Sequence, residues 1–378
     1  MKLVIISHTE HYKTSDGTVV GWSPTVNEIN HLADSFTSIT HVAMLHAGTA
    51  PKSTMAYTSQ NIDFVALPVL GGTSIYSKLK SIVYIPKVIS KVRKALKDAD
   101  AFQLRTPTGI AVFLIPYLTF FSKKKGWYKY AGNWNQKKPP LGYRFQRWML
   151  KKQKRRVTIN GAWENQPHHC KTFENPCLTD VDVVLGKKIV QSKLLDSKLN
   201  FCYVGRLETP KGVKRIIEAF KGLSDQEKNR VGDVHLVGDG EEKLAFETMA
   251  KNCGIHFVFH GYLDRTSVFE IYKKSHFFLM PTSASEGFPK VIAEASNFGC
   301  VPIVSNVSAI GQYIHHRQNG FVISPITSEG LVLQLKQVLQ LDNKSYEDLL
   351  TGSQNFSKTF TFSHYTRRIH NEILVTYQ

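Results

Sequence analysis

The sequence predicts an α/β protein of two domains, each with a mostly parallel sheet that is covered by helices on both faces. Three observations support this prediction. Short apolar runs typical of buried strands alternate with segments of helical spacing along nearly the whole chain. The 378 residues suffice for two domains of ordinary size. A stretch rich in Asn, Pro and His, residues 160–180, interrupts the alternation and is expected to link the domains.

In the first half, apolar runs predict strands at residues 3–6, 41–45, 64–67, 101–104 and 127–130. Residues at helical spacing predict helices at 25–36, 82–96, 110–121 and 141–156. The polar, glycine-containing segment 16–23 is expected to be a loop. The helix at 141–156 is basic and amphipathic, and we expect its apolar face to contain Phe145, Trp148 and Met149.

The second half repeats the alternation more clearly. Strands are predicted at residues 200–204, 234–237, 256–259, 277–280, 301–304 and 320–323, and helices at 210–220, 241–252, 266–274, 328–340, 346–354 and 363–377. The expected division of the chain is a first domain at 1–180, a second at 181–355, and a terminal segment, 356–378, whose helix crosses back toward the first domain.

Composition favours a cytoplasmic protein. The chain begins with an apolar strand-like run, which leaves no room for a signal peptide. Its longest apolar segment, 110–121, is well below the roughly 20 residues needed to cross a bilayer. Five scattered cysteines fit a reducing compartment better than a disulfide framework.

The formal net charge of +18 favours anionic partners, and the excess is local. No acidic residue lies between Asp100 and Glu164. Lys123, Lys124 and Lys125 in this interval adjoin aromatic residues, a combination that suits a lipid headgroup layer. Each basic residue near an anionic surface contributes about 1 kcal/mol. We therefore expect region 105–156 to attach the protein peripherally to the inner face of the cell membrane. A solvated positive face is the alternative, and nucleic acid is disfavoured because no recognised binding module accompanies the charge.

Residues 281–304 carry the strongest functional signal. A loop of small residues leads to Glu286, Gly287, Phe288 and Pro289, and a helix follows that contains Glu294. Pro289 suits the first helical position, and Gly287 lets the backbone approach a ligand. The N–H groups of the helix start can hold a diphosphate, while the two carboxylates can accept hydrogen bonds from sugar hydroxyls. The alternative is an ordinary amphipathic helix.

Glu286 and Glu294, with GFPKVIA between them, resemble the E-X7-E motif of the retaining glycosyltransferases of family 4 (group 1). The resemblance implies the GT-B fold, two Rossmann-like domains that face each other across a cleft. It also implies that Glu286 contacts hydroxyls of the donor sugar and that Glu294 contacts the ribose. Backbone N–H groups at Gly287 and Phe288, next to Pro289, would bind donor oxygens.

A second block, Gly205-Arg206-Leu207 followed by Lys211-Gly212, resembles the G-R-L-x-x-x-K-G signature of the same family. Gly205 ends a predicted strand, so Arg206 and Lys211 lie at the carboxyl end of the sheet, where open α/β sheets bind ligands. Both cations could hold a diphosphate and neutralise the charge on a departing nucleotide. The alternative, a solvated pair at a helix start, is unfavourable because cations there oppose the helix dipole.

Two further segments complete the resemblance. The turn Val237-Gly238-Asp239-Gly240 resembles the family's V-G-D-G turn, and Asp239 is expected to cap the next helix. Relatives carry a glycine pair near the donor phosphates in the first domain; here Gly21 matches the first glycine, and Trp22 replaces the second. No catalytic histidine is matched in this domain, where Arg105 stands at the corresponding strand end.

No metal site is expected, because His168, His169, Cys170 and Cys177 have none of the usual tetrahedral spacings. The resemblance implies a metal-independent, retaining transfer without a cofactor, from a UDP- or GDP-linked sugar to an acceptor hydroxyl. A lipid-linked or saccharide acceptor in surface polysaccharide or lipopolysaccharide assembly is the expected setting. A sugar-nucleotide epimerase of the same fold and a non-catalytic binding protein are the alternatives.

Overall fold

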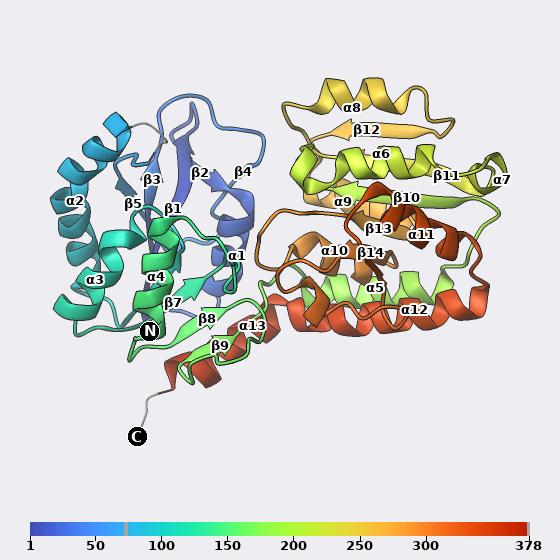
Figure 1. Ribbon diagram of the computed structural model, residues 1–378. Helices are drawn as coiled ribbons and strands as arrows, with labels where there is room; N and C mark the ends of the chain where they lie inside the picture. Colours follow the sequence, from blue (N-terminus) through green and yellow to red (C-terminus); the bar gives the residue numbers. More distant parts are fainter. Residues whose placement is uncertain (72–74, 376–378) are drawn as a thin grey trace. The chain divides into compact units, whose positions relative to one another are not determined.

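The structure, a computed structural model, describes residues 1–71 and 75–375, with side chains described outside residues 72–81. The chain folds into two compact units (Figure 1). The first unit comprises Met1–Asn175 together with His364–Gln378, and the second comprises Pro176–Ser363. In the described part of the chain, no helix is long and apolar enough to cross a membrane.

The sheet of the first unit is mostly parallel. Its parallel strands run in the order β5 (Ile62–Leu67), β3 (Ser38–Leu45), β1 (Lys2–Lys13), β6 (Ala101–Thr106), β7 (Lys125–Tyr130), β8 (Val157–Ile159) and β9 (Cys170–Thr172). Two short strands extend the sheet beside the end of β1: β2 (Val19–Trp22) pairs antiparallel with β1, and β4 (Thr54–Ala56) pairs antiparallel with β2. The parallel strands therefore share one carboxyl edge.

Alternating strand residues divide the core of the first unit into two layers. Leu3 and Ile5 pack with α1 (Ser23–Ala33) and with Tyr365 of α13 (Phe362–Arg368). On the other face, Val4 and Ile6 share a core with residues of α2 (Ile75–Leu96), α3 (Ala111–Phe121) and α4 (Leu141–Lys151). Figure 1 shows these three helices on one side of the sheet. A π-helix, Ile369–Leu374, continues α13; Thr376 and Tyr377 of the predicted terminal helix lie outside the described residues.

The second unit contains a fully parallel sheet. Its strands run in the order β12 (Phe257–Gly261), β11 (Val231–Val237), β10 (Leu199–Val204), β13 (Phe277–Met280), β14 (Val301–Ser305) and β15 (Phe321–Ile323). The first strand of the unit, β10, thus lies in the middle, and the strand order reverses between β10 and β13. In sheets of this order, ligands bind beyond the carboxyl ends of the strands at that reversal.

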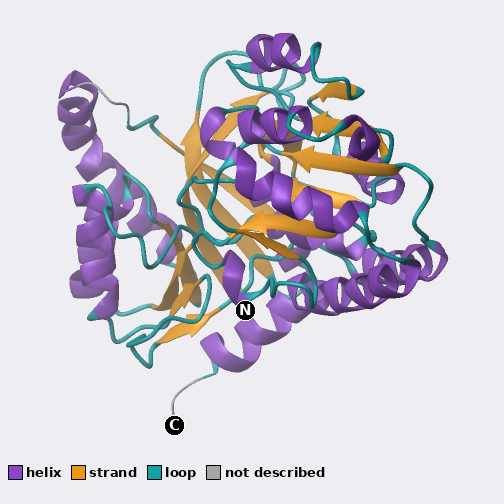
Figure 2. Cartoon of the chain, turned by 45° about the vertical axis from the view of Figure 1, so that its right-hand side comes forward, coloured by secondary structure: helices purple, strands orange, loops and turns teal. Residues whose placement is uncertain are grey.

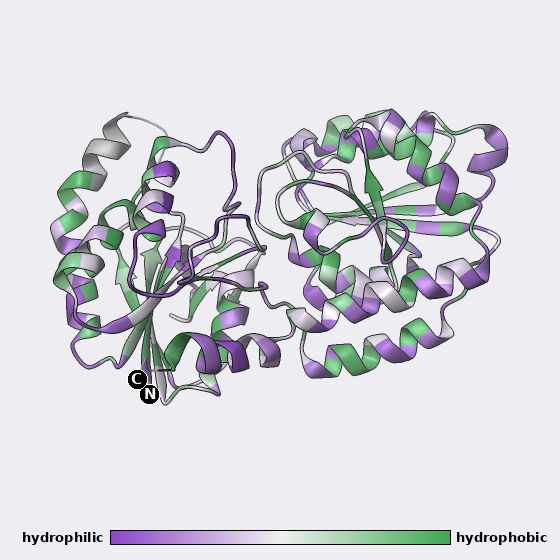
Figure 3. Ribbon diagram, turned by 60° about the horizontal axis from the view of Figure 1, so that its bottom comes forward, coloured by the Kyte–Doolittle hydropathy of each residue, from purple (hydrophilic) through white to green (hydrophobic). Residues whose placement is uncertain are grey.

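Helices surround this sheet, as Figure 2 shows. They are α5 (Asp180–Ser192), α6 (Val213–Lys221), α7 (Asp225–Lys228), α8 (Lys243–Ala250), α9 (Arg265–Lys274), α10 (Lys290–Asn297), α11 (Ser328–Leu339) and α12 (Asn343–Ser357). Most are amphipathic, and the alternation of hydrophilic and hydrophobic residues along them is visible in Figure 3. On α6, for example, Ile216, Ile217 and Phe220 are buried while Lys214 is exposed.

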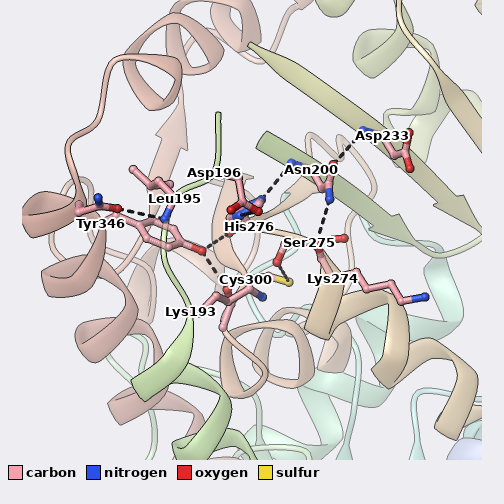
Figure 4. Close-up of polar contacts among 12 residues, drawn as sticks. Lys193, Leu195, Asp196, Asn200, Asp233, Lys274, Ser275, His276, Cys300 and Tyr346 are labelled. Carbon is pink, nitrogen blue, oxygen red and sulfur yellow. Dashed lines mark hydrogen bonds and ion pairs between the residues drawn. The ribbon is translucent and has the colours of Figure 1, made fainter. Parts of the chain in front are cut away.

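Polar side chains close the amino-terminal edge of the second sheet (Figure 4). The His276 ring accepts a hydrogen bond from the Asn200 N–H at 3.0 Å, and the Tyr346 hydroxyl donates to the His276 carbonyl at 3.3 Å. The partly buried Lys193 side chain donates from its ammonium to the Tyr272 carbonyl at 3.0 Å, and desolvation lowers the pKa of this lysine. These bonds join the helices to the starts of the strands, at the edge opposite the strand reversal.

Three sequence expectations are wrong in detail. Segment 16–23 contains β2, because Asp16 and Gly17 make a tight turn and β-branched Val19 and Val20 then pair back onto β1. Segment 160–180 contains β9, whose first residue, Cys170, is buried. In addition, α4 ends at Lys151, and the following residues lead into β8.

Candidate donor site at the strand reversal

Two loops meet where the strand order reverses in the second unit. One follows β10 and ends at Gly212, and the other follows β13 and ends at Pro289. The Lys211 ammonium forms an ion pair with Oε1 of Glu286. The Lys211 side chain is only 13% exposed, whereas that of Glu286 is 42% exposed. Two predicted site residues, on the loops that follow β10 and β13, are thus in direct contact at the edge of the sheet.

Close backbone packing shapes the first loop. The N–H of Gly205 donates to the Val237 carbonyl at 3.0 Å, and the N–H of Leu207 donates to the Asp239 carbonyl at 2.9 Å. A Cβ on Gly238 would lie 1.9 Å from the Gly205 carbonyl oxygen. The glycine at 238 therefore allows the turn after β11 to lie against the turn after β10.

A short 3-10 turn, Thr209–Lys211, positions the lysine. The Glu242 carboxylate accepts hydrogen bonds from the N–H of Thr209 at 2.6 Å and from its hydroxyl at 2.7 Å. Gly212 ends the turn at φ +98°, and a Cβ there would lie 2.3 Å from the Pro281 carbonyl oxygen. Only glycine fits this conformation at this distance from the second loop.

Asp239 does not cap α8. Its carboxylate accepts from the N–H of Gly240 at 2.9 Å, and α8 begins two residues later than expected, at Lys243, with Glu242 as its N-cap residue. The expected capping role is therefore wrong, because the Glu242 side chain contacts Thr209 and the helix starts beyond the reach of Asp239.

The second loop is clamped to the first by groups that the sequence motifs did not single out. The N–H of Ser283 donates to the Pro210 carbonyl at 2.9 Å. Arg215 of α6 donates to the Pro281 carbonyl at 3.0 Å and to the Ser283 hydroxyl at 3.2 Å. The sequence signal for Arg215 was its place in the first turn of the helix that follows Lys211 and Gly212.

Phe288 directs its side chain into the core. Its ring lies 4.9 Å from that of Tyr313 and 4.8 Å from that of Phe360, centroid to centroid. In the described part of the chain, the N–H groups of Gly287 and Phe288 have no hydrogen-bond acceptor. Pro289 is the N-cap residue and α10 starts at Lys290, one position later than expected. The loop thus presents two free donors beside Glu286, as expected for binding oxygen atoms.

Glu294 lies within α10 and is partly buried. Burial raises the pKa of its carboxyl group, nearby Arg265 and Lys290 lower it, and Asp182 raises it. Among the described residues, no group donates a hydrogen bond to this carboxylate, whereas Asp182 is paired with Arg265 at 2.8 Å. An unpaired carboxylate with a raised pKa is typical of a functional site.

Arg206 and Gly21 occupy other environments. The Arg206 side chain is 69% exposed and pairs with Glu208 at 2.8 Å, while Lys211 pairs with Glu286. Gly21 belongs to the first unit and pairs with His11 across β1 and β2. A Cβ on Gly21 would lie 2.3 Å from the His11 ring, so a packing requirement accounts for this glycine. Its contact with a donor stays a prediction.

Potential metal ligands are dispersed. Within residues 1–71 and 75–375, no group of three or more His, Cys, Asp or Glu residues could hold a metal ion. Cys170 is buried in the first unit, and the buried Cys177 thiol donates to the Lys290 carbonyl in the second.

Comparison with known proteins places these observations in a family context. Residues 187–354 match the family model described as "Glycosyl transferases group 1". The chain is 26% identical over 207 residues to a lipopolysaccharide 1,6-galactosyltransferase of Salmonella typhimurium, a match that covers 51% of this chain and 56% of the relative. It is 28% identical over 150 residues to an uncharacterized glycosyltransferase of Haemophilus influenzae, covering 38% and 42%. The chain therefore spans about half the length of the curated relatives it matches.

Solved structures resemble the whole chain. Anabaena HepE in complex with UDP has a TM-score of 0.69 at 14% identity, covering 98% of both chains. WaaG, a glycosyltransferase involved in lipopolysaccharide biosynthesis, has a TM-score of 0.64 at 14% identity, covering 99% of this chain and 100% of the other. At these identities the likeness concerns the fold alone, and it confirms the predicted α/β fold of GT-B type.

Proposed function

Residues 187–354 match the model of the group 1 glycosyltransferases, and on this ground we propose that the protein is a glycosyltransferase that moves a sugar from a nucleoside-diphosphate sugar to an acceptor hydroxyl. The observation that carries the proposal is the Lys211–Glu286 pair, which joins two loops at the strand reversal of the second unit. At this edge of the sheet, the cation can bind the diphosphate of a nucleotide-sugar donor, and the carboxylate can bind the hydroxyl groups of its sugar.

Each site residue has a defined role in this proposal. Lys211 binds the donor diphosphate, and the exposed Arg206 turns from Glu208 to the same group; together they neutralise the charge on the departing nucleotide. The free N–H groups of Gly287 and Phe288 bind donor oxygens. Glu286 accepts hydrogen bonds from hydroxyls of the transferred sugar.

Glu294 binds the ribose. Its carboxylate has no hydrogen-bond donor among the described residues, and burial raises its pKa. Two ribose hydroxyls would donate the missing hydrogen bonds, so binding of the nucleotide would offset part of the cost of desolvating this partly buried carboxylate. UDP is the first nucleotide to test, because HepE, of similar fold, was solved in complex with it.

Transfer proceeds with retention of the sugar's configuration, and the leaving phosphate takes the proton of the acceptor hydroxyl on the same face of the sugar. Such a mechanism requires no enzymatic nucleophile. Lys211, Arg206 and the start of α10 supply the positive potential for the leaving group, so we propose that the reaction needs no metal ion and no cofactor.

The acceptor is a lipid-linked or saccharide chain in lipopolysaccharide or surface polysaccharide assembly. The named relative from Salmonella, a lipopolysaccharide galactosyltransferase, supports this setting. The basic region 105–156 attaches the protein to an anionic membrane, on the inner face, where such acceptors are assembled.

The test is nucleotide release. The protein is incubated with UDP-glucose or UDP-galactose, with and without a panel of saccharide and lipid-linked acceptors, and free UDP is measured. Transfer predicts UDP release that depends on one class of acceptor, and a product whose anomeric configuration equals that of the donor by NMR. Isomerisation of the donor without an acceptor would instead indicate an epimerase and contradict the proposal.

A further inference from the structure

Helix α4 of the first unit buries only part of its expected apolar face. The sequence pattern placed Phe145 and Trp148 on a buried face with Met149. In the structure, Met149 is buried, whereas Phe145 and Trp148 are 37% and 51% exposed. Arg147, expected in solvent, donates instead to the backbone carbonyls of Trp134 and Gln136.

The exposed side of α4 combines an apolar stripe with cations. Leu141, Phe145 and Trp148 follow one another at helical spacing, and Leu141 is 72% exposed. The Phe145 and Trp148 ring centroids lie 6.1 Å apart, and the Lys152 ammonium lies 4.6 Å from the Trp148 ring centroid. The α4 face is defined here as this stripe together with its cations, Lys137, Lys138, Arg144, Lys151 and Lys152.

No carboxylate neutralises this face. In the part of the chain that the structure describes, none of its five cations has a carboxylate within ion-pair distance, and no acidic residue occurs between Asp100 and Glu164. An exposed aromatic stripe surrounded by cations matches the boundary between headgroups and acyl chains of an anionic bilayer. A second copy of the chain is a poor partner, because it would bring the same positive charge.

The helix is held rigidly in this orientation. The side chain of Gln146, on the buried side, accepts from the N–H of Thr108 at 3.1 Å and donates to its carbonyl at 2.9 Å. Leu150 lies in the core, and α3 packs beside α4 (Figure 1). Thr108 belongs to the loop that follows β6, so Gln146 ties α4 to the carboxyl edge of the first sheet.

We propose that the α4 face docks in the headgroup layer of an anionic phospholipid bilayer, with Trp148 and Phe145 inserted and the cations bound to lipid phosphates. The inference rests on the proposed membrane attachment and assigns it to one helix. Because α4 is tied to the carboxyl edge of the first sheet, docking brings that ligand-binding edge to the membrane, where a lipid-linked acceptor would reach it.

Vesicle co-sedimentation of the full chain tests this assignment. The protein should sediment with vesicles of equal parts phosphatidylcholine and phosphatidylglycerol, and not with phosphatidylcholine alone. Lys151→Glu with Lys152→Glu should lower the partition coefficient at least about thirtyfold, since two favourable charges are lost and two unfavourable ones are gained. Lys221→Glu with Lys251→Glu, the same charge change at exposed sites of the second unit, should retain binding.

Tryptophan substitutions test insertion. Trp148→Ala should weaken sedimentation, whereas Trp22→Ala, a residue of the same 51% exposure on β2, should not. Anionic vesicles should shift the tryptophan fluorescence of the wild type to the blue, and Trp148→Phe should lose that shift. Circular dichroism and melting temperature of each variant verify folding.

Three results would overturn the assignment. Sedimentation of the α4 variants at the wild-type level would place the contact elsewhere while leaving membrane attachment intact. Absence of wild-type sedimentation at low salt would refute both the membrane attachment and its assignment to the α4 face. The nucleotide-release assay would still test the proposed sugar transfer independently. Retention of a short DNA duplex, lost in the same variants and without vesicle binding, would assign the face to nucleic acid.

Discussion

Substitution of Gly212 by alanine should disrupt the donor site by separating its two loops. Gly212 has φ +98°, and its added Cβ would lie 2.3 Å from the Pro281 carbonyl oxygen. The left-handed conformation costs a residue with a Cβ roughly 1–2 kcal/mol. The overlap must be relieved by moving backbone, which costs roughly another 1–3 kcal/mol. The expected loss in the free energy of unfolding is therefore about 2–5 kcal/mol.

The same substitution should reduce nucleotide affinity. Lys211 precedes Gly212 and reaches Glu286 on the second loop, so a displacement of Pro281 alters the spacing of the ion pair. The assay is a thermal melt of the second unit combined with calorimetric titration of UDP well below the melting temperature. For a unit of this size, each kcal/mol lowers the melting temperature by about 2–4 °C.

Gly222→Ala is the matched control. Gly222 ends α6 at φ −76°, and the nearest atom to its added Cβ would be Val332 Cγ2 at 3.4 Å, an ordinary contact. This variant should melt near the wild-type temperature and bind nucleotide normally. If Gly212→Ala also melted like the wild type, or melted lower but bound UDP unchanged, then the close packing of the two loops would not determine the donor site.

Three further variants separate binding from packing. Lys211→Ala should weaken UDP binding at least about tenfold in calorimetry, because a charge-assisted hydrogen bond contributes about 1.5–3 kcal/mol. The control variant Lys214→Ala should bind UDP like the wild type. Equal affinities of the two variants would contradict the role of Lys211. Glu294→Gln should melt higher than the wild type at pH 7 but not at pH 4. The pKa of this carboxyl is raised in the folded state, so the protonated group stabilises the fold at pH values below its unfolded-state pKa of about 4.3. This stability is lost as the pH rises through the folded-state pKa. An equal gain in melting temperature at pH 7 and pH 4 would refute this reasoning. Gly21→Ala should lower the melting temperature of the first unit, because the added Cβ would lie 2.3 Å from the His11 ring. The affinity for UDP should not change. A loss of UDP affinity without a change in melting temperature would instead support a donor contact at Gly21.

The longer elements could be predicted from the sequence because their patterns are local. The core strands of the second unit are short apolar runs, and helices such as α6 show a buried stripe. Strands of three or four residues, such as β2, β8 and β9, carry too few residues for a periodicity and form only because a neighbouring strand accepts them. The orientation of α4 was predicted wrongly because its apolar residues exceed the width of one buried face.

The site residues could be predicted as motifs but not as a geometry. Glu286 and Lys211 were found in separate loops, and their contact follows only from the adjacency of β10 and β13, which is a property of the sheet order. Arg215 bonds to Pro281 of the second loop, and Glu242 bonds to Thr209 of the first loop. Both bonds join residues that are distant in the chain, and no local pattern reports such bonds. Asp239 was misassigned because the register of a helix start depends on where the preceding turn is anchored.

Binding of a nucleoside diphosphate to the second unit tests the central claim most directly. UDP, GDP and ADP are titrated into the wild type and Glu294→Ala, and the melting temperature of each mixture is recorded. At a concentration of 100 times its dissociation constant, the preferred nucleotide should stabilise the wild type by about 2.7 kcal/mol. Glu294→Ala should show a much smaller gain. If no nucleotide stabilised the wild type, the strand reversal would not be a donor site and the proposed transfer reaction would be refuted.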